Sequence, residues 1–163
     1  MSKLLKFEIV KHEPYRFIGK SVYARAGMAC GSGNFCAFLW DNSQWIFDAL
    51  DNLKKYSVAE EPRNAALLTW DKHCDKANLL GYTVGRFMKA DTPVPDGMDY
   101  FDFAAGYIAK GQFDTYDGSE EALMEEMIQN QAEYTSASYR FMVEIGEFEN
   151  EPGFAYYISC DKK

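Results

Sequence analysis

One segment divides this chain of 163 residues into two parts that repeat the same order of predicted elements. Residues 91–98 contain Pro93, Pro95 and Gly97, a composition typical of a linker. Before the linker, and again after it, a helical pattern is preceded by a strand pattern and followed by two more. This order predicts an α+β fold, a pseudo-two-fold duplication of a strand-helix-strand-strand unit with repeats at residues 1–90 and 99–160.

The first repeat contains the longest helical pattern of the chain, after strand composition at residues 7–10 and 15–24. Apolar residues recur there at alternating three- and four-residue steps, which predicts one helix of about six turns with a buried stripe. The stripe consists of Phe35, Phe38, Trp45, Ala49, Leu53 and Tyr56, interrupted by the polar Asn42. Strands are expected next at residues 65–70 and 79–88.

The second repeat shows the same patterns. Residues 101–113 are strand-like, and residues 117–120 resemble a capping box at the start of a second helix. Residues 139–148 alternate, Pro152-Gly153 predicts a turn, and a last strand follows at residues 154–160. The likeness of residues 16–20 to residues 106–110 also supports a duplication.

We expect residues 1–163 to form a single domain, because each repeat has too little core to stand alone. Antiparallel sheets, two long helices and a central ligand groove where the repeats meet are the predicted architecture. The 26 aromatic residues outnumber the 23 Leu, Ile and Val residues. Aromatic side chains line small-molecule pockets and cation sites, although they also fill ordinary cores.

The balance of charge excludes one class of partner. Net charge is −8 and the isoelectric point is near 4.8. Direct nucleic-acid binding is not expected, because phosphate contacts need a clustered basic patch.

The cysteine pattern and the hydropathy predict the cellular compartment of the protein and whether it binds a cofactor. No apolar run reaches the length of a membrane span, and the first residues lack a signal-peptide pattern. The four cysteines form no CxxC pair, so we expect a cytoplasmic protein with reduced thiols. His73 and Cys74 lack a second pair of ligands at the right spacing, so neither a metal nor another cofactor is expected.

Glu144 lies in the middle of an alternating strand pattern. Phe141, Val143 and Ile145 are expected on one face, packed on the core, and Met142 shares the other face with Glu144. If that second face is open to solvent, Glu144 is an ordinary surface carboxylate. If it lines a crevice, Glu144 is a partly desolvated anion that favours a cationic partner.

Three short motifs carry a resemblance to a known family. Residues 103–111, FAAGYIAKG, are similar to a segment of the gyrase-inhibitor-like small-molecule-binding domain, which is also the effector-binding domain of multidrug-responsive transcription activators. Residues 143–146, VEIG, and residues 155–159, AYYIS, resemble two later motifs of the same family. Their order and spacing extend the resemblance across essentially the whole chain.

The resemblance implies a groove that receives lipophilic cations on a buried glutamate among tyrosines. Glu144 matches that glutamate, and Tyr157 matches the family's closing tyrosine. Gly146 stands where the family motif has tyrosine, which implies a pocket that is wider or filled from elsewhere. Ser159 replaces the usual proline.

The remaining candidate ligand contacts are aromatic residues of both repeats. Trp45 lies on the predicted helix stripe and is expected in the core, whereas Trp40 lies off it and is a candidate groove wall. Trp70 ends a predicted strand. Tyr82 and Tyr107 lie within strands, where their hydroxyls can reach a ligand.

Three functions remain open from the sequence. The first is cytoplasmic binding, sensing or sequestration of amphipathic, often cationic, small molecules, without an attached DNA-binding unit. The second, implied by some stand-alone relatives, is a hydrolase that opens reactive cyclopropane rings, with Glu144 as general base and Tyr107 or Tyr157 polarising a carbonyl. The third is an inhibitor module that acts on a protein partner, which no segment identifies.

Overall fold

The computed structural model describes residues 1–25, 34–59, 61, 64–69, 79–137, 141–148 and 151–163. These residues contain nine strands and three α-helices, and every strand pairing is antiparallel. The predicted α+β class is therefore confirmed. The chain divides into two compact units: a central unit, residues 14–104, and a terminal unit that joins residues 1–13 to residues 105–163.

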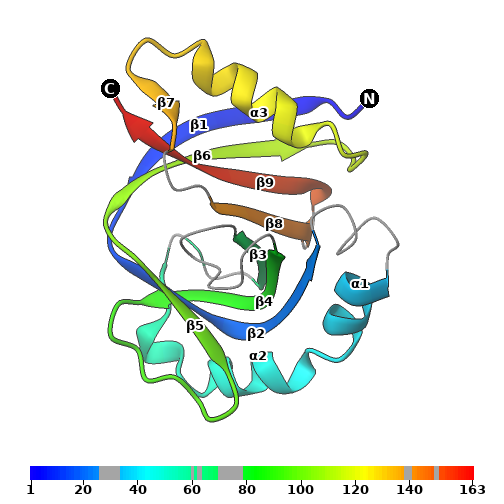
Figure 1. Cartoon of the computed structure of the whole chain (residues 1–163), viewed down its shortest axis with the longest axis vertical. Coiled ribbons are helices and arrows are strands. Elements are labelled where there is room, and N and C mark those ends of the chain that lie inside the picture. The colour runs from blue at the N-terminus through cyan, green and yellow to red at the C-terminus, as the bar shows by residue number, and fades with distance from the viewer. Residues whose placement is uncertain (26–33, 60, 62–63, 70–78, 138–140, 149–150) are drawn as a thin grey trace. The chain divides into compact units, whose positions relative to one another are not determined.

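The four strands of the central unit pair antiparallel with one another (Figure 1). Its strands lie in the order β3-β4-β2-β5. The elements are β2 (Tyr15–Arg25), α1 (Asn34–Asp41), α2 (Gln44–Asp51), a short 3-10 helix η1 (Lys54–Tyr56), β3 (Ala65–Thr69), β4 (Leu79–Lys89) and β5 (Asp99–Phe103).

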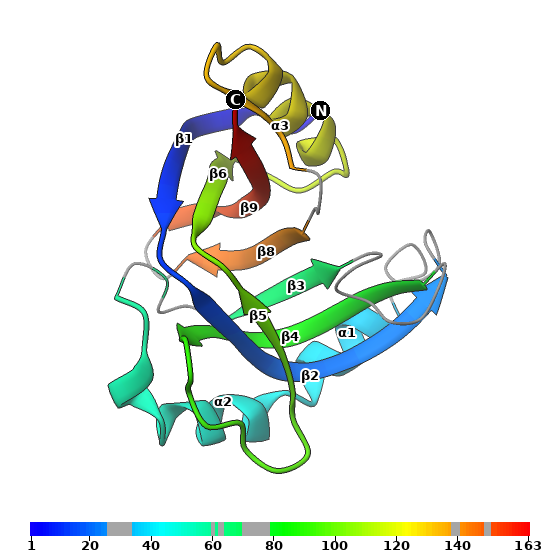
Figure 2. The same ribbon diagram turned by 60° about the vertical axis from the view of Figure 1, so that its left-hand side comes forward.

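The terminal unit has a sheet in the order β1-β6-β9-β8, with the short β7 also paired to β9. Figure 2 shows β6 running between β1 and β9. The elements are β1 (Leu4–His12), β6 (Gly106–Phe113), α3 (Glu120–Gln129), β7 (Tyr134–Ser136), β8 (Phe141–Phe148) and β9 (Glu151–Lys162).

The predicted duplication appears within each unit as strand, helix, strand, strand. In the central unit these are β2, the α1–α2 segment, β3 and β4, and in the terminal unit they are β6, α3, β8 and β9. Each unit also gains an edge strand: β5, which precedes β6 in the chain, pairs with β2, and β1, which precedes β2, pairs with β6. The predicted linker, residues 91–98, connects β4 to β5 inside the central unit. The expectation that residues 1–163 unfold as one cooperative domain stays a prediction.

The expected long helix at residues 35–56 is wrong. The chain forms α1 and α2 instead, because the side chains of Asn42 and Ser43 bond to backbone carbonyls at the end of α1. The break changes which residues face the sheet: Phe38 is 66% exposed and Trp45 is 47% exposed. The buried positions are Leu39, Ile46, Phe47 and Leu50.

The helices cover one face of each sheet. In the central unit, Asp51 at the end of α2 forms an ion pair with Arg86 of β4 at 2.9 Å, so the Arg86 side of β4 faces the helices. In the terminal unit, a Cβ atom at Gly111 of β6 would lie 2.3 Å from the Sδ atom of Met124 in α3. Glycine at position 111 thus permits the close approach of α3 to the sheet.

The sequence likeness between residues 16–20 and residues 106–110 does not place matching residues on matching faces of the two units. Ile18 pairs with Arg86 and lies on the helix-covered face of the central unit. Ile108 pairs with Ser159, on the face opposite Gly111 and α3. The repeated order of elements therefore carries the duplication, and the five-residue likeness does not.

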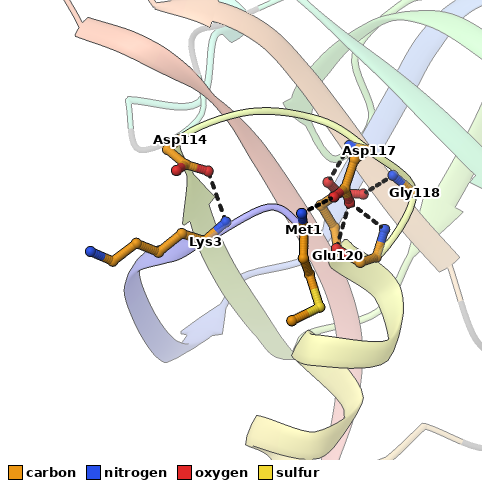
Figure 3. Close-up of polar contacts among 7 residues, drawn as sticks. Met1, Lys3, Asp114, Asp117, Gly118 and Glu120 are labelled. Atoms are coloured by element: carbon orange, nitrogen blue, oxygen red, sulfur yellow. Dashed lines mark hydrogen bonds and ion pairs between the residues drawn. The ribbon is translucent and has the colours of Figure 1, made fainter.

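The loop before α3 is held by two carboxylates (Figure 3). Both carboxylate oxygens of the buried Glu120 accept backbone N–H bonds, from Asp117 at 2.8 Å and from Gly118 at 2.9 Å. Asp117 in turn accepts bonds from the hydroxyl and backbone N–H of Ser119, which lower the pKa of the Asp117 carboxyl to about 2. Asp117 also pairs with the amino group of Met1 at 3.2 Å.

Glu120 should therefore contribute more to the stability of the fold than an exposed glutamate in the same helix. We expect Glu120→Gln to lower the free energy of unfolding by about 1–3 kcal/mol, because the amide group presents an N–H to a backbone donor in a buried site. Glu121→Gln is the matched control, since Glu121 is exposed in the same helical turn and loses the same favourable interaction with the helix dipole. Urea unfolding of both variants measures the difference, and equal losses would contradict this account.

Candidate functional site

Glu144 lies on β8 directly opposite Tyr156 of β9. Side chains of directly paired residues in antiparallel strands project from the same face, about 4.5–5.5 Å apart at their Cβ atoms. Tyr156 is 4% exposed, and its hydroxyl contacts the Sδ atom of Met142, the neighbour of Glu144 on that face. We call this set, Met142, Glu144 and Tyr156, the Glu144 face.

The Glu144 face is not an open solvent surface. Glu144 is half-buried and Met142 is 2% exposed. On the other side of Tyr156, the register continues to Gly111, which α3 covers through Met124. The carboxylate therefore belongs to the helix-covered side of the terminal sheet, beside an aromatic ring and a thioether.

The other face of β8 is also buried, as the alternation predicts. Phe141, Val143 and Ile145 are each at most 6% exposed. Tyr157 pairs with Val143 on one side and with Lys110 on the other, so it lies on this second face. The structure thus places Glu144 and Tyr157 on opposite faces of one sheet.

Tyr107 shares the face of Glu144 but lies far along it. It pairs with Cys160, four residues from Tyr156 on β9, and its ring packs on that of Tyr134 with 5.5 Å between centroids. Strand spacings put Tyr107 and Glu144 roughly 16 Å apart. Neither Tyr107 nor Tyr157 is therefore brought beside Glu144, and this arrangement does not favour the hydrolase hypothesis.

The candidates of the central unit lie on its helix-covered face. Trp40 of α1 donates its indole N–H to the hydroxyl of Tyr82 on β4 at 2.9 Å. The Trp40 ring also packs on Phe47 of α2, with 6.1 Å between centroids. Trp40 is half-buried, whereas Trp45, expected in the core, is the more exposed tryptophan. Trp70 lies outside the described residues.

Sequence reasoning missed Tyr156 as the partner of Glu144. A turn at Pro152-Gly153 would bring Glu144 opposite a residue near the end of the chain. The structure instead starts β9 at Glu151 and pairs Phe148 with Glu151, which brings Tyr156 opposite Glu144. Alternation along β9 indicates that Tyr156 and Tyr157 face opposite ways, but only the strand register says which of them meets Glu144.

Among the described residues, the structure shows neither a metal-binding cluster nor a membrane-spanning helix. In the part of the chain that the structure describes, no group of three or more His, Cys, Asp or Glu side chains is placed to hold a metal ion. His73 and Cys74 lie outside that part. Of the helices formed by the described residues, none combines the length and apolar character needed to cross a bilayer.

Comparisons with solved structures identify the fold. SAV2435, solved with bound tetraphenylphosphonium, superposes with a TM-score of 0.60 at 10% identity, over 98% of this chain and 94% of that one. The integron cassette protein VCH_CASS2 of Vibrio cholerae has a TM-score of 0.54 at 10% identity and 99% coverage of both chains. EcmrR, solved in a complex with DNA, has a TM-score of 0.56 at 11% identity, and the match spans 97% of this chain but 58% of EcmrR.

The chain has the gyrase-inhibitor-like fold that its sequence resemblance implies. At these identities the likeness concerns the fold. No protein-family model matches the sequence, and no curated protein sequence matches it either.

Cys160 of β9, on the same face as Tyr156, should be unreactive in the folded protein. Burial, reinforced by the charge of Asp161, raises the pKa of its thiol from near 9 to about 11. Because the thiolate is the reactive form, we expect alkylation of Cys160 by iodoacetamide at neutral pH to be about 100-fold slower in native than in unfolded protein. Peptide-resolved mass spectrometry measures the rate at this cysteine alone. Similar rates in both states would contradict a buried, protonated thiol.

Proposed function

We propose that this protein binds amphipathic small molecules, lipophilic cations above all, with the Glu144 face as the anchor. The single observation that carries the proposal is the direct pairing of Glu144 with Tyr156, which sets a half-buried carboxylate beside an aromatic ring. A carboxylate attracts the positive charge of a ligand, and an aromatic ring attracts a cation through its negative face.

The neighbouring side chains suit ligands of varied shape. Met142 is a flexible, polarizable side chain that adapts to irregular surfaces. The net charge of −8 also attracts cations at long range, an effect that salt screens. Binding through charge and aromatic contact selects for cationic, apolar compounds without demanding one shape, which is the property of a multidrug-binding protein.

The fold supports the proposal by analogy. SAV2435, which shares the fold, was solved with a lipophilic cation, and EcmrR, which shares it over part of its length, was solved on DNA. We propose that the present protein senses or sequesters such compounds in the cytoplasm, where Cys160 stays reduced.

Glu144→Gln tests the anchor, because it keeps the shape of the side chain and removes its charge. We expect tetraphenylphosphonium to bind at least about fivefold more weakly, a loss of about 1 kcal/mol. Triphenylphosphine oxide, a neutral compound of related shape, should bind the variant and the wild type about equally. Isothermal titration calorimetry measures both.

Glu126→Gln on the exposed side of α3 is the control, since it removes one negative charge and changes the long-range field equally. Equal affinity of the wild type and Glu144→Gln for the cation would refute the proposed anchor. An equal loss in both variants would show that only the overall charge matters.

The two tyrosines of β9, Tyr156 and Tyr157, should contribute unequally to cation binding. We expect Tyr156→Leu to weaken cation binding about threefold to tenfold, because it removes the ring next to Glu144. Tyr157→Leu, one residue away on the opposite face, should have little effect. The comparison uses the same calorimetric titration, with circular dichroism to verify that both variants are folded. The reverse ranking would move the anchor to the face of Tyr157.

A further inference from the structure

The face opposite Glu144 already contains a cation. The ammonium nitrogen of Lys110, on β6, lies 5.1 Å from the centroid of the Tyr157 ring, on β9. The two residues are direct partners in the antiparallel register, so they project from the same side of the sheet. Tyr157 is 6% exposed and Lys110 is half-buried, so the contact is partly shielded from water.

Backbone pairing holds this contact in place. Lys110 is flanked on its other side by Glu8 of β1, and the β1–β6 and β6–β9 ladders both continue for several residues beyond it. The ladders fix where the Lys110 side chain starts, so its ammonium is held at a high effective concentration near the ring, whereas a free ligand must reach the ring from dilute solution.

The remaining neighbours of Tyr157 on this face are apolar or uncharged. Val143 lies opposite Tyr157 on β8, and Ala155 lies two residues along β9, opposite Gln112 of β6. Val143 and Ala155 are 0% and 3% exposed. Glu8 and Lys6 of β1 project from the same face beside Lys110 and Gln112, and they form an ion pair with each other at 3.6 Å. Besides Tyr157, this part of the face therefore presents two ammonium groups, one carboxylate, one amide and apolar side chains, with one positive charge in excess.

We infer that Lys110 is a specificity-determining residue: it occupies the Tyr157 ring as a built-in cation and keeps cationic ligands off this face of the sheet. The inference rests on the proposed function, because it concerns where a bound cation lies. A second positive charge at the ring would meet both an occupied aromatic face and repulsion from the ammonium. Neutral ligands meet no such repulsion.

The consequence is a division between the two faces of the terminal sheet. Cations are directed to Glu144 and Tyr156, and the side of Lys110 and Tyr157 rejects them. Tyr157, which the sequence resemblance implies as a ligand contact, contributes to cation binding only when Lys110 is removed.

The first test measures the contact without any ligand. In the NMR spectrum of the wild type, the ε-methylene protons of Lys110 should be shifted upfield by the current of the Tyr157 ring. Tyr157→Leu should return them to the ordinary lysine position. Unshifted protons in the wild type would overturn the inference, whatever the protein binds.

The second test measures affinity for tetraphenylphosphonium in Lys110→Met, Tyr157→Leu and the double variant. We expect Lys110→Met to bind at least threefold more tightly than the wild type, because the ring becomes available to the ligand. The double variant should lose that gain. Lys162→Met, at an exposed position of β9, is the control for the change in net charge.

The outcomes separate the inference from the proposed function. Wild-type binding that depends on Glu144, combined with unchanged affinity in Lys110→Met, would overturn the inference and leave the proposed function standing. A gain as large in Lys162→Met as in Lys110→Met would also overturn it, because the effect would then come from net charge. Absence of binding by every variant would refute the proposed function and with it the role of Lys110 toward ligands.

Discussion

The register between β8 and β9 is the constraint on which the candidate site depends. Side chains alternate across a strand, so a slip of one residue would move Tyr156 away from Glu144 and bring Tyr157 to its face. The pairing continues from Met142–Ile158 through Gly146–Phe154, and Ile158 is fully buried in the core. A slip would exchange buried apolar groups across the whole sheet, and this cost fixes the carboxylate beside its tyrosine.

The helix-covered side of the terminal sheet explains why Glu144 differs from an ordinary surface carboxylate. Gly111 has no side chain, so α3 can approach β6 until Met124 lies against the backbone. Phe113, on the same face as Gly111, is fully buried. A carboxylate at the margin of such a packed surface keeps fewer waters than a free one, and in the proposed function this strengthens its attraction for a ligand cation.

Much of the fold was predictable from the sequence, and the register was not. The order of strands and helices and the alternation of Phe141, Val143 and Ile145 follow from local periodicity, which a strand imposes whatever it pairs with. Pairing partners depend on turns and on distant segments. Pro152-Gly153 is a strong local turn signal, yet β9 runs through it, and the hydroxyl and amide of Ser43 and Asn42 divide a helix that apolar spacing alone would continue.

Lys110 and Glu144 give one thin sheet two chemically different sides. An aromatic ring attracts any cation within reach, so a protein rich in tyrosine and phenylalanine needs a way to decide which rings a ligand uses. The inferred role of Lys110 is one such way, because the strand register starts the lysine side chain directly opposite the ring and the ammonium lies 5.1 Å from the ring centroid. In the proposed function Glu144 acts in the opposite sense at Tyr156, since its carboxylate adds attraction for a cation beside that ring. Selectivity among cations and neutral compounds can therefore arise from strand register and two side chains of opposite charge.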